Sequence, residues 1–290
     1  MLRRIGGFFT VAGMTALLAG CDIGKTFDGF GWPQGGITEQ SKRMYDLWIG
    51  SVVAALAVGF FVWGLILWCV FRYRKRGQEL PVQTRFNLPI EVLYTVLPFL
   101  VISVLFYYTA VIQTDVNKVS KNPDVTVEVV PFKWNWQFNY RSGPGPEAQT
   151  VASTVGNSNL IPILVLPVGR TIRIEEHGKD VIHSFWVPEM LFKRDAFPGS
   201  TGNEFQITII QEGRFVGRCA ELCGTYHSMM NFEVVTVSPE RYQQYVDALK
   251  SGKTQPEAMA AIGFTGDQAY AVRTRPFPTE RTSDLPGAGL

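Results

Sequence analysis

The sequence has few of the residues that form covalent cross-links or metal sites, with only 4 cysteines and 3 histidines among 290 residues. Cys21 and Cys69 are far apart in apolar surroundings, so a framework of disulfide bridges is not expected. The chain also lacks an excess of charge of one sign, since 27 Lys and Arg face 25 Asp and Glu. No basic stripe with interleaved aromatic residues follows Lys118, which excludes nucleic acid as an expected partner.

The N-terminus has the features of a secretion signal. Residues 1–20 begin with Arg3 and Arg4, continue through an apolar stretch and end on small residues before Cys21. This order is typical of a secretory signal peptide. The ending "LLAGC" also resembles the bacterial lipoprotein cleavage site, so we expect lipidation of Cys21 and an external N-terminal segment over residues 21–44. An ordinary signal peptide or an uncleaved anchor is the alternative.

Two long hydrophobic runs follow. The first, about 45–71, has no charge between Asp46 and Arg72, and the second, about 88–112, contains only Glu91. Each exceeds the ~20 apolar residues that span ~30 Å of hydrocarbon. The loop between them, "RYRKRGQELPVQTR", is basic and should face the cytoplasm. We therefore predict a multi-pass protein of the bacterial cell membrane, with a transmembrane hairpin over residues 45–114 and both chain ends outside.

The pattern changes from about residue 124 to short apolar runs of period two: "VTVEVV", "ILVLPV", "TIRIE", "VIHSFWV", "FQITII", "RFVGRC" and "NFEVVTV". Such runs, separated by Gly, Pro, Asn and Asp, predict an all-β sandwich or barrel over residues 115–251. The segment "GPGPEAQTVASTVGNSN" (143–159) is predicted to be a long exposed excursion. After Pro239 a short helix is expected, and residues 252–290 are predicted to form an extended tail because they are rich in Pro, Gly and Thr.

Soft metal-binding side chains gather in the segment "CAELCGTYHSMM". Cys219 and Cys223 are three residues apart, and His227 and Met230 follow within the same loop. The strand "VIHSFWV" supplies His183 from another part of the predicted sheet. Thiolates, imidazoles and a thioether together favour copper over hard cations.

The number of thiolates indicates more than one copper ion. A mononuclear blue-copper centre uses two histidines, one cysteine and a weak axial ligand, so one cysteine is left over here. The economical interpretation is that the two sulfurs bridge two copper ions, each with one histidine. Met230 is then a weak ligand of one ion, and the backbone carbonyl of Glu221 is well placed for the other. Rigid ligands without an open position suit electron transfer better than catalysis.

Three alternatives remain open at this point. A structural Cys₂His₂ zinc site uses the same donors but leaves Met230 unexplained. A copper chaperone of thioredoxin fold would place its cysteines early in an α/β domain, rather than late in an all-β one. A plain disulfide between Cys219 and Cys223 would ignore both histidines.

The hairpin followed by "HSFWVP", "KRDAFPG" and "CAELCGTYHSMM" resembles subunit II of haem–copper cytochrome c oxidase. The resemblance covers about residues 45–248. It implies a two-helix transmembrane hairpin followed by an all-β cupredoxin domain, a Greek-key β-sandwich, which carries the binuclear CuA centre. By this resemblance the copper ligands are His183, Cys219, the Glu221 carbonyl, Cys223, His227 and Met230. The Glu221 side chain is also expected to bind a magnesium ion shared with subunit I.

The resemblance assigns roles to two further residues. "WNWQFNY" is similar to the aromatic stretch of the family, in which the first tryptophan, here Trp134, takes electrons from cytochrome c; ordinary packing is the alternative. "EVLYTVLP" is similar to the second helix, in which the glutamate, here Glu91, guards a proton-uptake channel. An intramembrane carboxylate is a functional candidate, although Glu91 could also extend to the membrane surface. His177 matches no ligand position.

The resemblance implies the electron-accepting subunit of a terminal oxidase. Electrons would pass from cytochrome c through the copper pair to haem in subunit I, where reduction of oxygen to water is coupled to proton pumping. The expected partners are subunits I and III, the lipid membrane, and cytochrome c or a membrane-tethered cytochrome c domain. The nearly neutral outer domain favours a tethered donor, because it lacks the charge that steers a soluble one. A membrane-anchored copper-delivery module is the alternative, while a quinol oxidase subunit would lack the cysteines.

Overall fold

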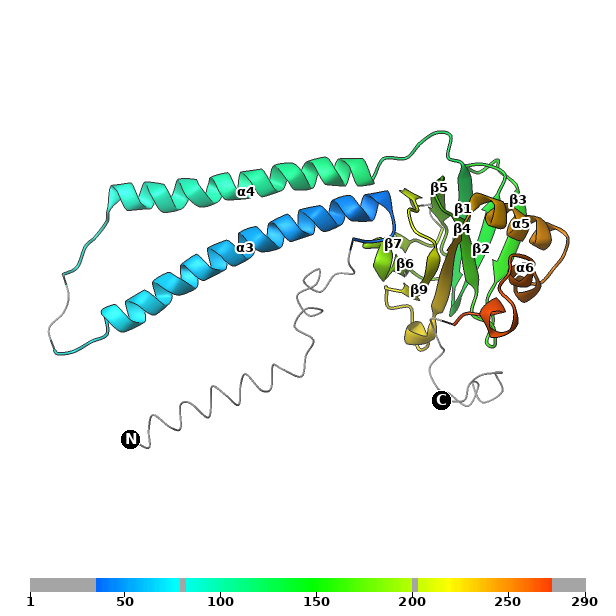
Figure 1. Ribbon diagram of the computed structural model, residues 1–290. Coiled ribbons are helices and arrows are strands. Elements are labelled where there is room, and N and C mark those ends of the chain that lie inside the picture. The colour runs from blue at the N-terminus through cyan, green and yellow to red at the C-terminus, as the bar shows by residue number, and fades with distance from the viewer. Residues whose placement is uncertain (1–34, 79–81, 200–202, 273–290) are drawn as a thin grey trace, which may run out of the picture. The chain divides into compact units, whose positions relative to one another are not determined.

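The computed structural model describes residues 35–78, 82–199 and 203–272 (Figure 1). The predicted signal peptide, the predicted lipidation site Cys21 and residues 273–290 lie outside the described residues. The chain divides into a helical unit, with residues 45–112, and a β-domain, with residues 35–44 and those from 113 onward.

The helical unit contains most of two long helices, α3 (Glu39–Arg72) and α4 (Leu88–Val116). Both are long and apolar enough to cross a membrane, and none of the residues in their most apolar windows is buried in the protein. A helix that is apolar on all sides is stable in lipid or in a protein core. The two helices therefore fit transmembrane segments.

The segment that precedes α3 is fixed to the β-domain. The Ile37 amide donates to the Glu189 carbonyl at 3.0 Å, and the Ile210 amide donates to the Ile37 carbonyl at 2.9 Å. The Ser41 amide then donates to Thr38 Oγ1 at 2.9 Å. A threonine that accepts a hydrogen bond in this way caps a helix N-terminus, which stabilises it by about 1 kcal/mol. This cap explains where α3 begins.

The β-domain is built from two five-stranded sheets. The first, in the order β3-β2-β1-β5-β8, consists of β1 (Val125–Phe132), β2 (Asn135–Arg141), β3 (Thr150–Val155), β5 (Thr171–Glu176) and β8 (Asn203–Thr208). The second, in the order β4-β10-β9-β6-β7, consists of β4 (Ile163–Pro167), β6 (His183–Val187), β7 (Phe192–Ala196), β9 (Gly213–Cys219) and β10 (Asn231–Val237). The prediction of two apolar helices followed by an all-β sandwich is confirmed.

The core lies between the two sheets. Trp136 of β2 packs edge-on against Phe232 of β10, with ring centroids 4.9 Å apart, and Phe185 of β6 stacks on Phe232 at 4.8 Å. All three side chains are at most 1% exposed. Burial of such large rings contributes strongly to stability. The core therefore supports β6, which begins at His183, β9, which ends at Cys219, and β10, which follows the loop with the other predicted ligands.

Two segments differ from the sequence-based expectation. The predicted excursion at 143–159 contains β3, which pairs with β2 in an antiparallel register. The predicted tail continues after α5 (Pro239–Lys250) with α6 (Gln255–Ala261) and a short 3₁₀ helix, η4 (Gly266–Ala269). Ala258 and Met259 of α6 are fully buried, and Gln255 accepts a hydrogen bond from the Ile163 amide at 2.9 Å. Residues 255–269 are therefore packed on the β-domain rather than extended.

Candidate metal centre

The predicted metal-binding loop connects the antiparallel strands β9 and β10. Cys219 is the last residue of β9, and its amide donates to the Met230 carbonyl at 3.0 Å, so the strand pairing closes the base of the loop. The short 3₁₀ helix η3 (His227–Met229) turns the chain back toward β10. The sequence between the two strands is thereby held as a compact loop with its sulfur atoms inward.

Strand β6 brings the remaining histidine to this loop. His183 is the first residue of β6, which pairs with β9 so that Phe185 lies opposite Cys219. The Ala220 amide also donates to the Ser184 carbonyl at 3.0 Å. As a result, His183 Nδ1 lies 3.8 Å from Cys219 Sγ, and the imidazole is fully buried.

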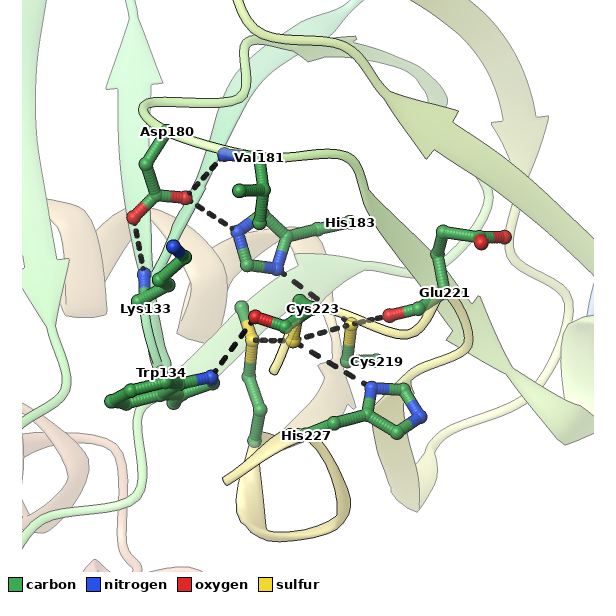
Figure 2. Close-up of polar contacts among 10 residues, drawn as sticks. Lys133, Trp134, Asp180, Val181, His183, Cys219, Glu221, Cys223 and His227 are labelled. Carbon is green, nitrogen blue, oxygen red and sulfur yellow. Dashed lines mark hydrogen bonds and ion pairs between the residues drawn. The ribbon is translucent and has the colours of Figure 1, made fainter. Parts of the chain in front are cut away.

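The donor atoms of all six predicted ligands meet at this end of the β-domain (Figure 2). The two cysteine Sγ atoms are 3.8 Å apart, and Cys219 Sγ lies 3.2 Å from the Glu221 carbonyl. Cys223 Sγ lies 3.6 Å from His227 Nδ1 and 3.8 Å from Met230 Sδ. A disulfide requires a sulfur–sulfur distance of about 2.05 Å, so the two cysteines are free thiols in this structure.

The donor set fits copper. It combines two thiols, two imidazole nitrogens, a thioether and one carbonyl, and soft ligands of this kind select copper over hard cations. Figure 2 shows the Glu221 backbone carbonyl directed to the sulfur of Cys219, while its carboxylate points away from the sulfurs. The glutamate therefore contributes its main chain, and not its charge, to the cluster.

The two thiols differ in acidity. Burial raises the pKa of Cys219, but hydrogen bonds with His183, with nearby backbone groups and with His227 outweigh it and lower the pKa to about 7. Burial and the charge of Cys219 raise the pKa of Cys223 to about 12. Metal binding deprotonates cysteine ligands and releases their protons, so the second thiolate is expected to form together with the metal site.

Asp180 is a functional residue that the sequence reasoning missed. Its Oδ1 lies 2.8 Å from His183 Nε2, and its carboxylate also accepts the backbone amides of Lys133, at 2.8 Å, and Val181, at 2.7 Å (Figure 2). A carboxylate behind a metal-binding histidine fixes the ring orientation and the tautomer. Here an ionised Asp180 favours the tautomer with the proton on Nε2, so that Nδ1, which faces Cys219 Sγ, is free of a proton. The available signal was an aspartate three residues before His183.

Trp134 packs directly on the metal-binding loop. Its indole Nε1 donates to the Cys223 carbonyl at 3.2 Å, and its ring meets Tyr226 edge-on at 4.9 Å. Gly224 permits this approach, because a Cβ there would lie 3.3 Å from the indole and its φ is +120°. The half-buried indole therefore reaches from the ligand loop toward solvent. Its predicted role in accepting electrons stays a prediction.

Two further residues singled out in the sequence belong to other elements. Glu91 is in the first turn of α4, where its carboxylate accepts the Asn87 amide at 2.9 Å, as a helix-capping residue does. Its proton-uptake role stays a prediction. His177 is half-buried with its Nε2 3.9 Å from a Glu128 carboxylate oxygen, away from the sulfur cluster.

Comparison with known proteins identifies the protein family to which the chain belongs. A family model described as "Cytochrome C oxidase subunit II, periplasmic domain" matches residues 125–237. A probable cytochrome c oxidase subunit 2 of Nocardia farcinica is 44% identical, over 97% of this chain and 90% of that protein. One from Streptomyces avermitilis is 43% identical, over 88% and 89%. The crystal structure of the periplasmic domain of subunit II from Bradyrhizobium japonicum is 28% identical, covering 47% of this chain and 98% of that one, with a TM-score of 0.38. The extent and identity of the sequence matches mean that this chain belongs to the cytochrome c oxidase subunit II family, part of the haem–copper terminal oxidases.

Proposed function

We propose that this chain is the electron-accepting subunit of its oxidase, with a binuclear CuA centre that takes electrons from cytochrome c and passes them to haem in subunit I. The observation that carries the proposal is the pair of free thiols 3.8 Å apart, with a histidine nitrogen within 3.8 Å of each. Two copper ions held by these donors would supply a one-electron acceptor whose charge is shared over both metals and both sulfurs.

The surroundings of the donors support electron transfer rather than substrate chemistry. The ligands come from β6, from the end of β9 and from a loop closed by strand pairing, so their positions are fixed by the core of the sandwich. Met230 is 1% exposed, and the Glu221 carbonyl, 3.2 Å from Cys219 Sγ, is proposed as the other weak ligand. A catalytic metal site keeps a coordination position open for substrate, which this set of six donors does not provide.

Trp134 is proposed as the place where electrons enter. Its hydrogen bond to the Cys223 carbonyl links the indole to a ligand residue through one N–H···O contact. The donor is proposed to be cytochrome c, most simply as a membrane-tethered domain, because the acids and bases of the chain are nearly balanced. A tethered donor needs no long-range electrostatic steering.

The remaining proposals concern the assembly. The basic loop between α3 and α4 supports a cytoplasmic position for that loop and an external position for the β-domain. The Glu221 carboxylate, directed away from the sulfurs, is available for a magnesium ion shared with subunit I. Subunits I and III are the proposed partners, lipidation of Cys21 would anchor the external N-terminus, and Glu91 is proposed to deliver protons for reduction and pumping.

Rapid reduction of the purified oxidase by reduced cytochrome c tests the proposed function. The expected result is that the copper absorption of this subunit is reduced first and haem in subunit I afterwards. Haem reduction that precedes any change at the copper, or that is equally fast in an oxidase depleted of this copper, would contradict an electron-accepting role.

A further inference from the structure

The β-domain also buries an ionisable group that is not a predicted metal ligand, the carboxyl of Glu176. Glu176 is the last residue of β5 and is fully buried. Side chains alternate across a strand, so Glu176 shares the inward face of β5 with Ile172 and Ile174, which are also fully buried. A carboxyl group therefore occupies a position where the strand pattern calls for an apolar side chain.

The Glu176 carboxyl has no hydrogen-bond partner for either oxygen among the residues that the structure describes. Arg194 of β7 supplies a positive charge that acts on Glu176, but its Nη2 donates to Asn117 Oδ1 at 2.6 Å. The guanidinium also lies over the Phe192 ring at 4.9 Å, and its Nε is buried and unpartnered within the described chain. Arg194 is thus engaged elsewhere and forms no ion pair with Glu176 among the described residues.

The other charged groups around β5 do not compensate Glu176. Asp195 of β7 adds a negative charge that acts against ionisation. On the outer face of the sheet, Arg173 pairs with Glu175 and with Glu204 of β8. Glu128 of β1 pairs with Arg141 of β2 at 3.0 Å, and His177 is 3.9 Å from Glu128. Arg173 and Arg141 are therefore paired with other carboxylates and do not neutralise Glu176.

The protonated form is therefore the stable one. An ionised carboxylate that is buried without a partner destabilises the fold strongly, and protonation removes this destabilisation. In agreement, burial raises the pKa of Glu176 well above its ordinary value; the weaker influence of Arg194 lowers it and that of Asp195 raises it.

We propose that Glu176 is a proton-binding site of the β-domain, whose carboxyl keeps its proton at neutral pH for as long as the end of β5 stays buried in the sandwich. Arg194 and Asp195 of β7 act electrostatically on Glu176. The same strand pairs with β6 so that Ala196 lies opposite His183 and Asp195 opposite Ser184. Loss of the proton would place an unpaired anion beside β7, the strand that supports the histidine ligand. The inference rests on the fold and not on the proposed function.

The competing arrangement is an ion pair between Glu176 and Arg194, and it predicts opposite behaviour. If Glu176 is neutral, Glu176→Gln keeps its size and removes the group that ionises at high pH, so the variant gains stability relative to wild type as pH rises. If Glu176 is an anion paired with Arg194, the same substitution leaves a buried cation unpaired and destabilises the domain at neutral pH.

The test is urea unfolding of the metal-free, full-length protein in detergent over a range of pH, followed by near-ultraviolet circular dichroism of the buried aromatic residues. A folded-state pKa above the unfolded value means that the stability contribution is complete at acid pH and is lost as pH rises. Wild type and Glu176→Gln should therefore coincide near the ordinary glutamate pKa of about 4.3. Above it, the wild-type unfolding constant should rise relative to the variant by about tenfold per pH unit until the folded carboxyl ionises.

Glu128→Gln is the matched control, because Glu128 has a 3.0 Å ion pair with Arg141. That variant should be less stable than wild type at neutral pH and show no gain at alkaline pH. Lower stability of Glu176→Gln at neutral pH, or curves that stay parallel to wild type, would overturn the proposal. If the Glu176→Gln variant does not fold, infrared spectra of wild type with isotope-labelled glutamate determine whether a buried glutamate is protonated. A protonated-carboxyl band at neutral pH that resists exchange supports the site, and its absence overturns it.

Discussion

The hairpin helices and the metal-binding loop place different demands on their residues. In α3 and α4, side chains such as Phe60, Trp63 and Phe99 are more than 60% exposed in the protein. Membrane crossing requires that these side chains be apolar, but it depends little on which apolar residue stands at each position. In the loop, each donor atom lies within 4 Å of another. Membrane crossing therefore depends on composition, whereas metal binding depends on single residues.

Cysteine shows the difference within one residue type. Cys69 on α3 is exposed and is a free thiol, while Cys219 and Cys223 are buried free thiols that face each other. The same substitution should have no effect in one region and abolish the site in the other. Three of the predictions below therefore compare a change at the metal-binding end with a control change elsewhere, and the fourth concerns the hairpin itself.

The largest effect is expected from removal of a thiol. Cys219→Ser or Cys223→Ser should eliminate the binuclear copper spectrum and electron transfer into the oxidase, because a hydroxyl cannot bridge two copper ions as a thiolate does. Folding should survive, since serine is close to cysteine in size and the large buried rings of the core are left in place. Copper content and visible absorption are the measurements. Cys69→Ser is the control and should match wild type, and a Cys219→Ser protein with two copper ions and full activity would exclude the ligand assignment.

The next largest effect should come from Asp180, which holds the His183 ring. Asp180→Ala removes the partner of His183 Nε2 and should weaken copper binding by about 10–100-fold, the usual effect of losing a group that orients a metal ligand. Asp180→Asn should retain part of the copper affinity, because an amide oxygen can still accept a hydrogen bond from His183 Nε2. Competition with a copper chelator measures the affinity. Asp247→Asn, an exposed position on α5, is the control, and equal affinities in all variants would leave Asp180 without a positioning role.

An intermediate effect is expected at Trp134. Trp134→Ala should slow reduction of the copper by cytochrome c by a larger factor than it changes cytochrome binding, because it removes the indole that contacts Cys223. Trp134→Phe keeps an aromatic ring without the N–H donor and should fall between. Stopped-flow reduction at several cytochrome concentrations separates binding from electron transfer. Trp68→Ala on α3 is the control, and parallel losses in binding and rate would indicate a packing role for Trp134.

The smallest effect is expected in the hairpin, at Glu91. Glu91→Gln removes the ionisable group, yet an amide oxygen can still accept the Asn87 amide, so the cap of α4 is retained. If Glu91 delivers protons, oxygen consumption by the assembled oxidase should slow while the copper spectrum and assembly with subunit I stay unchanged. Wild-type oxygen consumption in Glu91→Gln would contradict the proton-delivery role and leave Glu91 as a helix-capping residue. No single side chain tested in the hairpin would then be required for activity.

The sequence predicts best where one physical property dominates. Hydropathy alone located both helices, and period-two alternation located β1, β4, β5, β6, β8, β9 and β10. It missed β3, because this edge strand carries polar residues and leaves Val151 and Val155 exposed. It missed α6, a short helix whose capping box joins Thr254 and Glu257 within a polar stretch. Its amphipathic contact with the sandwich depends on tertiary packing.

The metal ligands could be predicted from the sequence, but the residues that hold them in position could not. Four of the six predicted ligands, Cys219, Cys223, His227 and Met230, are sulfur or imidazole side chains within one short segment, and this density is visible in the sequence. Asp180 is one aspartate in a loop, and only the fold brings its carboxylate to His183 and to the Lys133 amide at the same time. Glu176 could have been noticed, because in "TIRIEE" it continues the inward alternation of Ile172 and Ile174. Its lack of a partner depends on where Arg194 points.

Metal analysis of the purified full-length protein, combined with electron paramagnetic resonance, tests the central claim most directly. The account predicts two copper ions per chain, and a mixed-valence signal in which one unpaired electron is shared by both ions, because two thiolates bridge them. One zinc ion per chain, or one copper ion with an ordinary mononuclear signal, would contradict it.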